Sequence, residues 1–338
     1  MFRQTRTRTL AALAVLGLAA GCSSAPDADT TTTAARETSP RTSPAAGSPF
    51  WVDPASPAAQ QVERWEQQGR QRDARLLKLI ADRPAAIWPS AERPEPKIRE
   101  ATAAAAREGR TAVFVAYDIP HRDCGQHSAG GAYGADAYRD WIDRFARAIG
   151  DSEALVVLEP DAVAHIVDGC TPGEYHAERE QMLSEAIVRL KRQPRTKVYL
   201  DAGNPAWIRE SWKLVEPLKR AGVANADGFA LNVSNFQTDE TTKEYGRRLS
   251  EDLGGKHFVV DTSRNGNGPL GGDPSQAWCN PPGRALGTPP TKDTGDPRVD
   301  AYLWIKRPGE SDGQCRGGPS AGQWWADYAL ALARNSRA

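Results

Sequence analysis

The sequence predicts an α/β fold in which parallel strands alternate with helices. Two observations lead to this prediction: short apolar runs recur at intervals of roughly 25 to 45 residues, and stretches with helical spacing separate them. Apolar, β-branched runs of this length are typical of strands that are covered on both faces. Regular alternation of strand and helix favours parallel strands joined by right-handed crossovers.

Seven apolar runs are expected to form strands. In chain order they are 85–88, 112–118, 154–160, 197–203, 228–235, 257–263 and 301–307. Among the stretches between them, 174–193 shows a clear helical pattern. Its apolar residues lie on one broad face and are Met182, Leu183, Ile187 and Leu190. The chain of 338 residues, 39% hydrophobic and 25% charged, is long enough for one large domain with a buried core.

The first 21 residues are expected to be a signal peptide. Basic residues precede an apolar stretch of 11 residues that ends at Gly21 and Cys22, and this stretch is too short to span a membrane. A cysteine at this point resembles the lipobox of bacterial lipoproteins, although Ala19 stands where leucine is commoner. We expect lipidation at Cys22 and anchoring to the outer face of the cell membrane, with plain secretion as the alternative.

Residues 22–48 are rich in Thr, Ser, Ala and Pro, and such a segment buries too little apolar surface to offset its ordering entropy. We therefore predict a flexible tether at 22–48 and a single catalytic domain at 49–338. Removal of residues 1–21 takes away three arginines and leaves 40 basic against 43 acidic residues. This near balance indicates no nucleic-acid partner, and no membrane partner other than the lipid anchor.

Four cysteines remain beside Cys22, namely Cys124, Cys170, Cys279 and Cys315. An even number outside the cytoplasm indicates two disulfides. Three pairings are possible, and sequential pairing is the simplest. A metal site is the alternative, but no two cysteines have C-x-x-C spacing and the five histidines form no pair on one helix face, so we expect no metal.

Carboxylates gather where the predicted strands end. They are Asp118 and Asp123, Glu159 and Asp161, Asp201, Asp261, and Glu310 and Asp312. Any one of them could serve as a helix cap or a salt-bridge partner. The carboxyl ends of parallel strands share one rim, where ligands bind, and crowded like charges cost energy unless the protein uses them.

Glycoside hydrolysis is the chemistry that best uses carboxylates without a metal or a nucleophilic serine. One carboxylic acid protonates the leaving oxygen while a carboxylate handles water or attacks the sugar. Among the ten tryptophans, Trp207 and Trp278 fall in predicted loops, where they could stack on sugar rings. Trp304 falls inside a predicted strand, and we expect it in the core.

The chain resembles glycoside hydrolase family six, the endoglucanases and cellobiohydrolases that cleave β-1,4-glucans with inversion. The resemblance extends over about 49–331. It rests on the ordered motifs "SPFWVDP", "YDIPHRDCGQHSAGGA", "LEPDAVAHI", "YLDAGNPAWI", "LNVSNF", "VDTSRNGNGP", "WCNPPGRALG" and "WIKRPGESDG". It implies a distorted (β/α) barrel of about seven parallel strands, an active-site cleft at the carboxyl strand ends, sequential disulfides and no cofactor.

The resemblance also implies roles for individual residues. Asp161 in "EPD" would be the general acid, and Asp123 in "HRDC" would raise the pKa of that acid and relay a proton from the attacking water. Asp201 in "LDAG" would position or assist the substrate, and Asp312 in "GESDG" is the disputed candidate base. Tyr117 would support distortion of the sugar at the cleavage point.

The implied substrate-binding residues are Asn204, Trp207, Asn235, Trp278, Lys306 and Glu310. Trp207 and Trp278 would be stacking platforms on either side of the cleavage point, while Lys306 and Glu310 would bind sugar hydroxyls. Asn204 stands where the family often has histidine, a change that we expect to affect subsite affinity rather than catalysis.

Together these features predict a monomeric enzyme that cleaves internal bonds of cellulose or a related β-1,4-glucan. Only 35 residues separate Cys279 from Cys315, and 45 separate Cys124 from Cys170, which leaves little chain to roof a tunnel. Exo action of the cellobiohydrolase type is one alternative, and action on a bacterial surface β-glucan is another. A third is a non-catalytic glucan-binding lipoprotein, which retention of both proposed catalytic aspartates disfavours.

Overall fold

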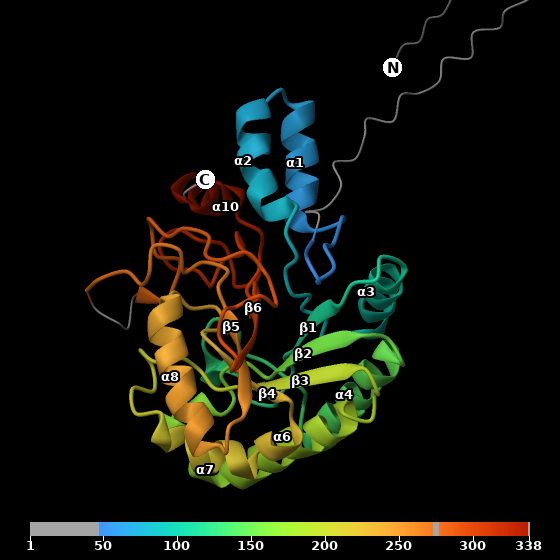
Figure 1. The fold of residues 1–338 in the computed structure, drawn as a ribbon, viewed down its shortest axis with the longest axis vertical. Coiled ribbons are helices and arrows are strands. Elements are labelled where there is room, and N and C mark those ends of the chain that lie inside the picture. Colours follow the sequence, from blue (N-terminus) through green and yellow to red (C-terminus); the bar gives the residue numbers. More distant parts are fainter. Residues whose placement is uncertain (1–46, 273–276, 337–338) are drawn as a thin grey trace, which may run out of the picture. The chain divides into compact units, whose positions relative to one another are not determined.

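A six-stranded parallel sheet forms the centre of the protein in this computed structural model (Figure 1). The strands are β1 (Ala112–Ala116), β2 (Ala154–Leu158), β3 (Thr196–Asp201), β4 (Gly228–Leu231), β5 (His257–Asp261) and β6 (Val299–Leu303). They lie in the sheet in the order in which they occur in the chain, and every neighbouring pair is parallel. The predicted α/β class with parallel strands is therefore confirmed.

The structure describes residues 47–272 and 277–336, which belong to one unit, Ser43–Ala338. The predicted signal peptide (1–21), Cys22 and nearly all of the predicted tether (22–48) lie outside the described residues, so they stay predictions. Within the described ranges, no helix has both the length and the apolar character that crossing a bilayer requires.

Both faces of the sheet are buried, as the apolar runs predicted. Along β1, Phe114 and Ala116 pack in the core between the sheet and the outer helices, while Val113 and Val115 point into a second core inside the curl of the sheet. The same alternation recurs in β2, where Val156 faces outward and Val157 faces inward. Side chains alternate across a strand, so a strand that is buried on both faces needs an apolar residue at each position.

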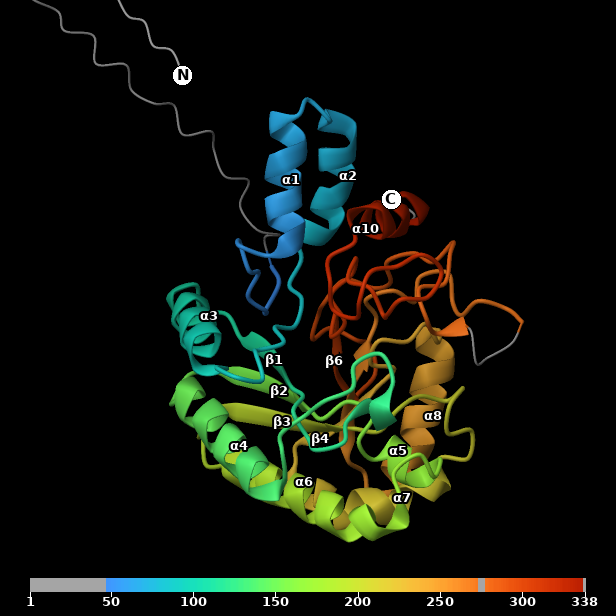
Figure 2. The same cartoon turned by 180° about the vertical axis from the view of Figure 1, so that it is seen from behind.

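The long helices cover the outer face of the sheet (Figure 2). They are α3 (Glu95–Arg107), α4 (Ala135–Ile149), α6 (His176–Leu190), α7 (Trp212–Arg220) and α8 (Asp239–Asp252). The four apolar residues predicted to form one face of the helix near 174–193 are buried on α6, which confirms that helix.

A smaller group of helices packs together around Trp304. These helices are α1 (Pro57–Gln67), α2 (Gln71–Ala81) and α10 (Ala326–Asn335). Trp304 is 2% exposed, in agreement with its predicted place in the core. The remaining short segments are α5 (Ala164–Val167) and the 3-10 turns η1 (Asp123–Gly125), η2 (Gly173–Tyr175) and η3 (Val223–Asn225).

The segment at 85–88, predicted as the first of seven strands, forms single bridges instead. Ile87 bonds to β1 in parallel fashion, and the Ala86 N–H donates to the carbonyl of Trp304, just after β6, at 2.8 Å. The segment therefore links the first and last strands and completes the curl of the sheet. Prolines flank it on both sides, and proline cannot donate to a ladder, so the pairing does not extend.

Two disulfides are present, and their pairing is the sequential one that was predicted: Cys124 with Cys170, and Cys279 with Cys315. The first joins the loop after β1 to the loop after α5, and the second joins two loops on the β6 side of the sheet. Both disulfides therefore lie in loops next to the strand ends.

Candidate active site

A cleft of about 930 Å³ lies at the carboxyl ends of the strands. Residues that follow each of the six strands line it. The lining includes the predicted site residues Tyr117, Asp123, Asp161, Asn204, Trp207, Asn235, Trp278, Lys306, Glu310 and Asp312. Among the predicted catalytic and substrate-binding residues, Asp201 alone is missing from the wall of the cleft.

Asp161 reaches the cleft from a strained turn after β2, with φ of 73° at Asp161 and 45° at Glu159. Its N–H donates to Oδ1 of Asp201 at 2.9 Å, which holds the turn in place. Burial raises the pKa of the Asp161 carboxyl to about 6; His165 opposes this rise and the negative charge of Asp123 adds to it. A protonated carboxyl at mildly acidic pH is what a general acid requires.

Asp201 is the last residue of β3 and is 0% exposed. Its Oδ1 accepts the N–H groups of Asp161 at 2.9 Å and Gly203 at 3.0 Å, and its Oδ2 is buried without a hydrogen-bond partner among the described residues. Burial, with the nearby charge of Asp161, raises the pKa of Asp201 well above its usual range. Asp201 therefore lies beneath Asp161, and the structure gives it a contact with the acid rather than with the cleft.

Asp123 lies in a loop that also carries strained backbone, with φ of 53° at Asp123 and 47° at Cys124. Its Oδ2 accepts the N–H of Ser128 at 2.6 Å, and the adjacent disulfide ties this loop to Cys170. The hydroxyl of Ser128 lies 3.0 Å from that of Tyr117, which joins the loop to the end of β1. The loop thus holds Asp123 and Tyr117 at the same part of the cleft.

Side-chain ligand atoms of Asp123, Asp161 and His165 lie within 4.8 Å of one another. The carboxyl groups of Asp123 and Asp161 therefore lie close together at the cleft. The same three donors are the set that a divalent cation could use here. Cys124 and Cys170 also lie near His165, but their sulfurs are bonded to each other and cannot serve as thiolate ligands.

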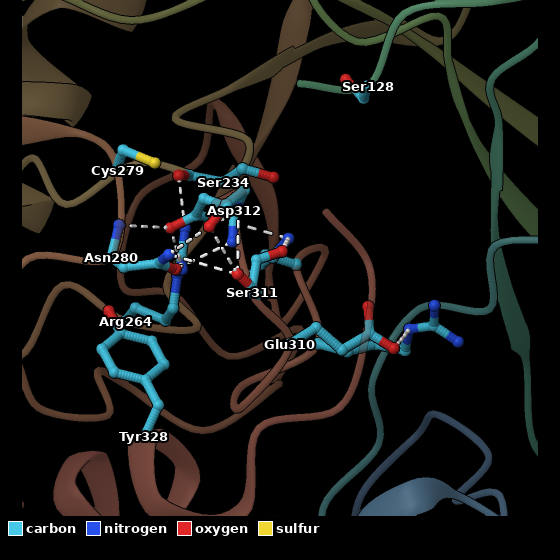
Figure 3. A network of polar contacts seen from close by, with 12 residues as sticks. Ser128, Ser234, Arg264, Cys279, Asn280, Glu310, Ser311, Asp312 and Tyr328 are labelled. Carbon is cyan, nitrogen blue, oxygen red and sulfur yellow. Dashed lines mark hydrogen bonds and ion pairs between the residues drawn. The ribbon is translucent and has the colours of Figure 1, made fainter. Parts of the chain in front are cut away.

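Asp312 has a very different environment, which Figure 3 shows. Its Oδ2 accepts from Nη1 of Arg264 at 2.8 Å and from the N–H of Asn280 at 3.0 Å, and Nζ of Lys306 lies 3.4 Å from its Oδ1. Burial alone would raise the pKa of Asp312, but the Arg264 guanidinium and the Lys306 ammonium hold it below its usual value. Asp312 therefore stays ionised and is a weak proton acceptor.

Arg264 and Asn280 were not predicted, although motifs of the resemblance contain them. Arg264 is 0% exposed, and Asn280 exchanges hydrogen bonds with Asp312 through its own N–H and its Oδ1. These residues lie 48 and 32 positions from Asp312 in the chain. No local pattern marks a partner at that distance, so only the fold reveals it.

Lys306 and Glu310 line the cleft but are strongly buried, at 8% and 4% exposed. The Lys306 Nζ donates to the carbonyl of Ser311 at 3.1 Å, and Glu310 forms an ion pair with Arg307 at 2.7 Å. Burial lowers the pKa of Lys306 and raises that of Glu310. Both groups already have protein partners, so contact with a sugar would use their remaining hydrogen-bonding capacity.

Aromatic rings lie along the cleft. The indole of Trp207 donates to Oδ2 of Asp168 at 2.8 Å and meets the His165 ring edge-on, with ring centres 4.8 Å apart. Trp278 packs against His127 with ring centres 5.7 Å apart. Trp88, which was not predicted, lines the same cleft in edge contact with Tyr117 at 5.5 Å.

Asn204 and Asn235 bond mainly to their own loops. Oδ1 of Asn204 accepts the N–H groups of Ala206 and Trp207, each at 3.1 Å. Oδ1 of Asn235 accepts the N–H of Phe236 at 2.8 Å and Nε2 of Gln237 at 3.1 Å. Each asparagine uses its Oδ1 atom to shape a loop that lines the cleft. Its side-chain NH2 group is the part that is left to contact a ligand.

The other strand-end carboxylates do not line the cleft. Asp118, Glu159 and Asp261 are at most 4% exposed. Oδ1 and Oδ2 of Asp261 accept four backbone N–H groups from neighbouring loops, including that of Lys306 at 2.9 Å. Glu159 likewise accepts backbone N–H groups, and Asp118 forms an ion pair with Arg122 at 3.5 Å, so each of these three carboxylates has a structural role.

Comparisons with known proteins agree with this geometry. The model of the family described as glycosyl hydrolases family 6 matches residues 45–336. Endoglucanase A of Cellulomonas fimi is 42% identical over 292 residues, which cover 85% of this chain and 61% of that protein. Endoglucanase 1 of Streptomyces halstedii is 41% identical, with 84% of this chain and 88% of that protein covered.

Among solved structures, the endoglucanase Cel6 from Mycobacterium tuberculosis matches with a TM-score of 0.80 and 42% identity. The match covers 87% of this chain and 99% of that one. The chain thus spans nearly all of that solved structure, but only about three fifths of the length of Endoglucanase A.

Proposed function

The chain belongs to glycosyl hydrolases family 6, and we propose that it hydrolyses β-1,4-glucosidic bonds within glucan chains. The observation that supports this most directly is Asp161 on the cleft wall, with a raised pKa and with Asp123 beside it. The relatives at 41% and 42% identity are named endoglucanases, in line with cleavage at internal bonds.

In the proposed mechanism, the protonated Asp161 gives its proton to the glycosidic oxygen as the bond to the leaving sugar breaks. Asp123, within 4.8 Å of Asp161, raises the pKa of the acid and accepts a proton relayed from the attacking water. Asp201 holds the turn that carries Asp161. We assign no carboxylate as a nucleophile, so the water attacks directly and the anomeric centre is inverted.

The relay through Asp123 is preferred to direct proton abstraction by Asp312. Arg264 and Lys306 stabilise the ionised form of Asp312 and so weaken it as a base. We assign to Asp312 the role of fixing the loop and the position of Lys306 at the cleft. In this proposal Asp123 accepts the proton of the attacking water, and Asp312 takes part in no proton transfer.

Sugar binding is proposed along the rings of Trp207 and Trp278, with Tyr117 at the cleavage point between them. Lys306 and Glu310 would bind hydroxyl groups, and the amides of Asn204 and Asn235 would add contacts from their loops. The Mycobacterium tuberculosis structure was solved with methyl-cellobiosyl-4-deoxy-4-thio-β-D-cellobioside, and we extend that ligand class, a cello-oligosaccharide, to this cleft.

The same reasoning extends to location and assembly. Two disulfides favour an oxidising compartment outside the cytoplasm. We propose that lipid on Cys22 anchors the enzyme to the outer face of the membrane and that the enzyme acts as a monomer. Mass spectrometry of the membrane-extracted protein tests the anchor: a diacylglyceryl adduct on Cys22 is expected, and an unmodified mature terminus would overturn it.

A panel of soluble glucans tests the activity. We expect a rapid loss of viscosity in carboxymethylcellulose with few new reducing ends, as internal cleavage requires, and no action on a β-1,3-glucan. Release of cellobiose without loss of viscosity would instead indicate exo action. Binding without any product would indicate a glucan-binding protein.

Proton NMR within minutes of adding enzyme to a cello-oligosaccharide tests the stereochemistry. The α-anomer of the new reducing end should appear first, because water attacks from the face opposite the leaving group. Early appearance of the β-anomer would mean that a carboxylate acts as nucleophile and that the roles given to these aspartates are wrong.

A further inference from the structure

The loop that leads from β1 to Asp123 is held from one side by Glu159, a buried acid at the end of β2. Both side-chain oxygens of Glu159 accept the N–H of Asp118, at 3.0 and 3.1 Å, and Oε2 also accepts the N–H of Ile119 at 3.1 Å. Glu159 is 0% exposed and stands two positions before Asp161. Glu159 therefore begins the turn that carries Asp161 and also binds the loop that leads to Asp123.

The next two residues of the same loop are held by Arg179 of α6, which is 2% exposed. Its Nη2 donates to the carbonyls of Pro120 and His121, each at 3.0 Å. Its Nη1 donates to Oγ1 of Thr171 at 2.7 Å and to the carbonyl of Ala162 at 3.4 Å. One guanidinium thus bonds to the loop before Asp123 and to the residue directly after Asp161.

We propose that Glu159 and Arg179 are positioning residues that together fix the separation between Asp123 and Asp161. The inference rests on the proposed function, which gives these two aspartates their roles. The four consecutive residues 118 to 121 present two N–H groups to the Glu159 carboxyl and two carbonyls to the Arg179 guanidinium, so each of these four residues is bonded to one of the two side chains.

The backbone explains why such bonding is needed. His121 and Asp123 in one loop, and Glu159 and Asp161 in the other, all have positive φ, between 45° and 73°. Non-glycine residues adopt this region only where the surroundings over-determine it. Without Glu159 and Arg179 both loops could relax to commoner conformations, and the carboxyls they carry would move apart.

The pair is arranged to bind the loop rather than to form a simple ion pair. No ion pair within residues 47–272 and 277–336 joins Glu159 to Arg179 directly. Glu159 accepts from backbone N–H groups, and three of the four hydrogen bonds that Arg179 donates go to backbone carbonyls, which set the path of the chain. Neither side chain lines the cleft, so each acts through the aspartates and not on the sugar.

Replacement of Arg179 by Gln tests the proposal, with Leu183→Ala as the matched control. Leu183 lies on the same helix, is 0% exposed and packs in the apolar core, so its truncation destabilises the fold through lost packing instead of lost hydrogen bonds. Arg179→Gln should lower kcat on a soluble cello-oligosaccharide by about 10²-fold with KM changed less than threefold, as misplaced catalytic groups do. Leu183→Ala should keep kcat within about twofold of the parent.

A second measurement needs no activity. The titration of the Asp161 carboxyl, followed by ¹³C NMR in the free protein, should move to lower pH by about half a pH unit in Arg179→Lys, which keeps the positive charge but loses hydrogen bonds to the loop, because Asp123 is then farther away. Leu183→Ala should leave this titration unchanged. Glu159→Gln, which replaces one acceptor oxygen by a donor, should shift it in the same direction.

The outcomes separate the two proposals. A parent protein that releases no product from any glucan would overturn the proposed function, while the NMR titration would still decide the positioning role. An unchanged titration and a kcat like that of Leu183→Ala would overturn the positioning role. If Arg179→Gln does not fold, Arg179→Lys takes its place, because lysine keeps the positive charge but lacks the planar guanidinium with its two donor groups. A kcat of Arg179→Lys equal to that of the parent would likewise overturn the positioning role.

Discussion

The two sides of the cleft hold carboxylates at the same sheet edge, yet their pKa values move in opposite directions. On the β1 to β3 side, Asp161 lies near Asp123 and His165, Asp201 lies near Asp161, and burial raises both pKa values. On the β6 side, Arg264 and Lys306 lower the pKa of Asp312. Burial by itself does not decide whether a carboxyl carries a proton.

The two sides of the cleft differ in the positively charged side chains that lie beside their carboxylates. Burial penalises the charged form on both sides, because water is excluded from both. A guanidinium that is itself 0% exposed and 2.8 Å from Asp312 reverses that penalty, whereas the neighbours of Asp161 are Asp123 and His165 and its pKa stays raised. The first side therefore keeps Asp161 protonated at mildly acidic pH, and the second side holds Asp312 as a fixed negative charge.

The largest effect on activity should come from Asp161→Asn, which removes the carboxyl group that donates the proton in the proposed mechanism. Hydrolysis of a soluble β-1,4-glucan should fall by about 10²- to 10⁴-fold, the usual value of general acid catalysis. Circular dichroism should match the parent, because asparagine has nearly the same shape. The exposed Asp140 serves as the control, since Asp140→Asn should change nothing; retention of more than half the activity in Asp161→Asn would contradict the assignment.

On the opposite side, Arg264→Met should act on stability. It leaves Asp312 buried beside one cation fewer, and breaking a buried pair in this way costs about 3 to 5 kcal/mol in the free energy of unfolding. Urea denaturation measures this loss. Arg247→Met is the control, because Arg247 pairs with Asp296 with half of its side chain exposed and should cost less than about 1 kcal/mol.

The sign of the pH dependence is fixed for this side as well. The folded-state pKa of Asp312 is lowered, so its contribution to stability is present above the unfolded-state value of about 3.9 and is lost as the pH falls through the folded-state pKa. The difference in unfolding free energy between the parent and Arg264→Met should therefore shrink at strongly acidic pH. A difference that stays constant down to pH 2 would contradict this origin.

Asp123→Asn should change the pH profile on the first side. In the parent, kcat/KM should fall as the pH rises above about 6, because Asp161 loses its proton there. Removal of the negative charge of Asp123 lowers the pKa of Asp161, so this alkaline limb should move to lower pH by up to about one pH unit. A limb that stays in place or moves to higher pH would show that Asp123 does not act on the acid.

The smallest effect should come from Asp201→Asn, which removes a buried acid with a raised pKa. Such a group stabilises the fold below its unfolded-state pKa, and that contribution is lost as the pH rises through the folded-state value. The variant should thus gain stability relative to the parent as the pH rises from 5 to 9, by about 1 kcal/mol or about 2 °C in Tm. Thermal unfolding at both pH values measures it, and a gain that is larger at pH 5 would reverse the sign argued here.

The site was predictable from sequence to different extents on the two sides. Asp123, Asp161 and Asp312 stand next to strand ends, where a carboxylate in a motif is visible without a structure. Arg264 and Asn280, which give Asp312 its lowered pKa, are 48 and 32 positions from it. Composition and spacing carry no signal for such partners, so the electrostatic difference between the two sides was not predictable.

The sequence by itself determined the parallel α/β fold, because apolar runs buried on both faces and helical stretches between them are local patterns. It also placed carboxylates at one rim. Only the tertiary structure decided which of them face the cleft: Asp161 does, whereas Glu159, two positions earlier, is 0% exposed and bonds to backbone. It also decided that 85–88 forms bridges and not a strand, because hydrogen-bond partners and burial are set by segments far apart in the chain.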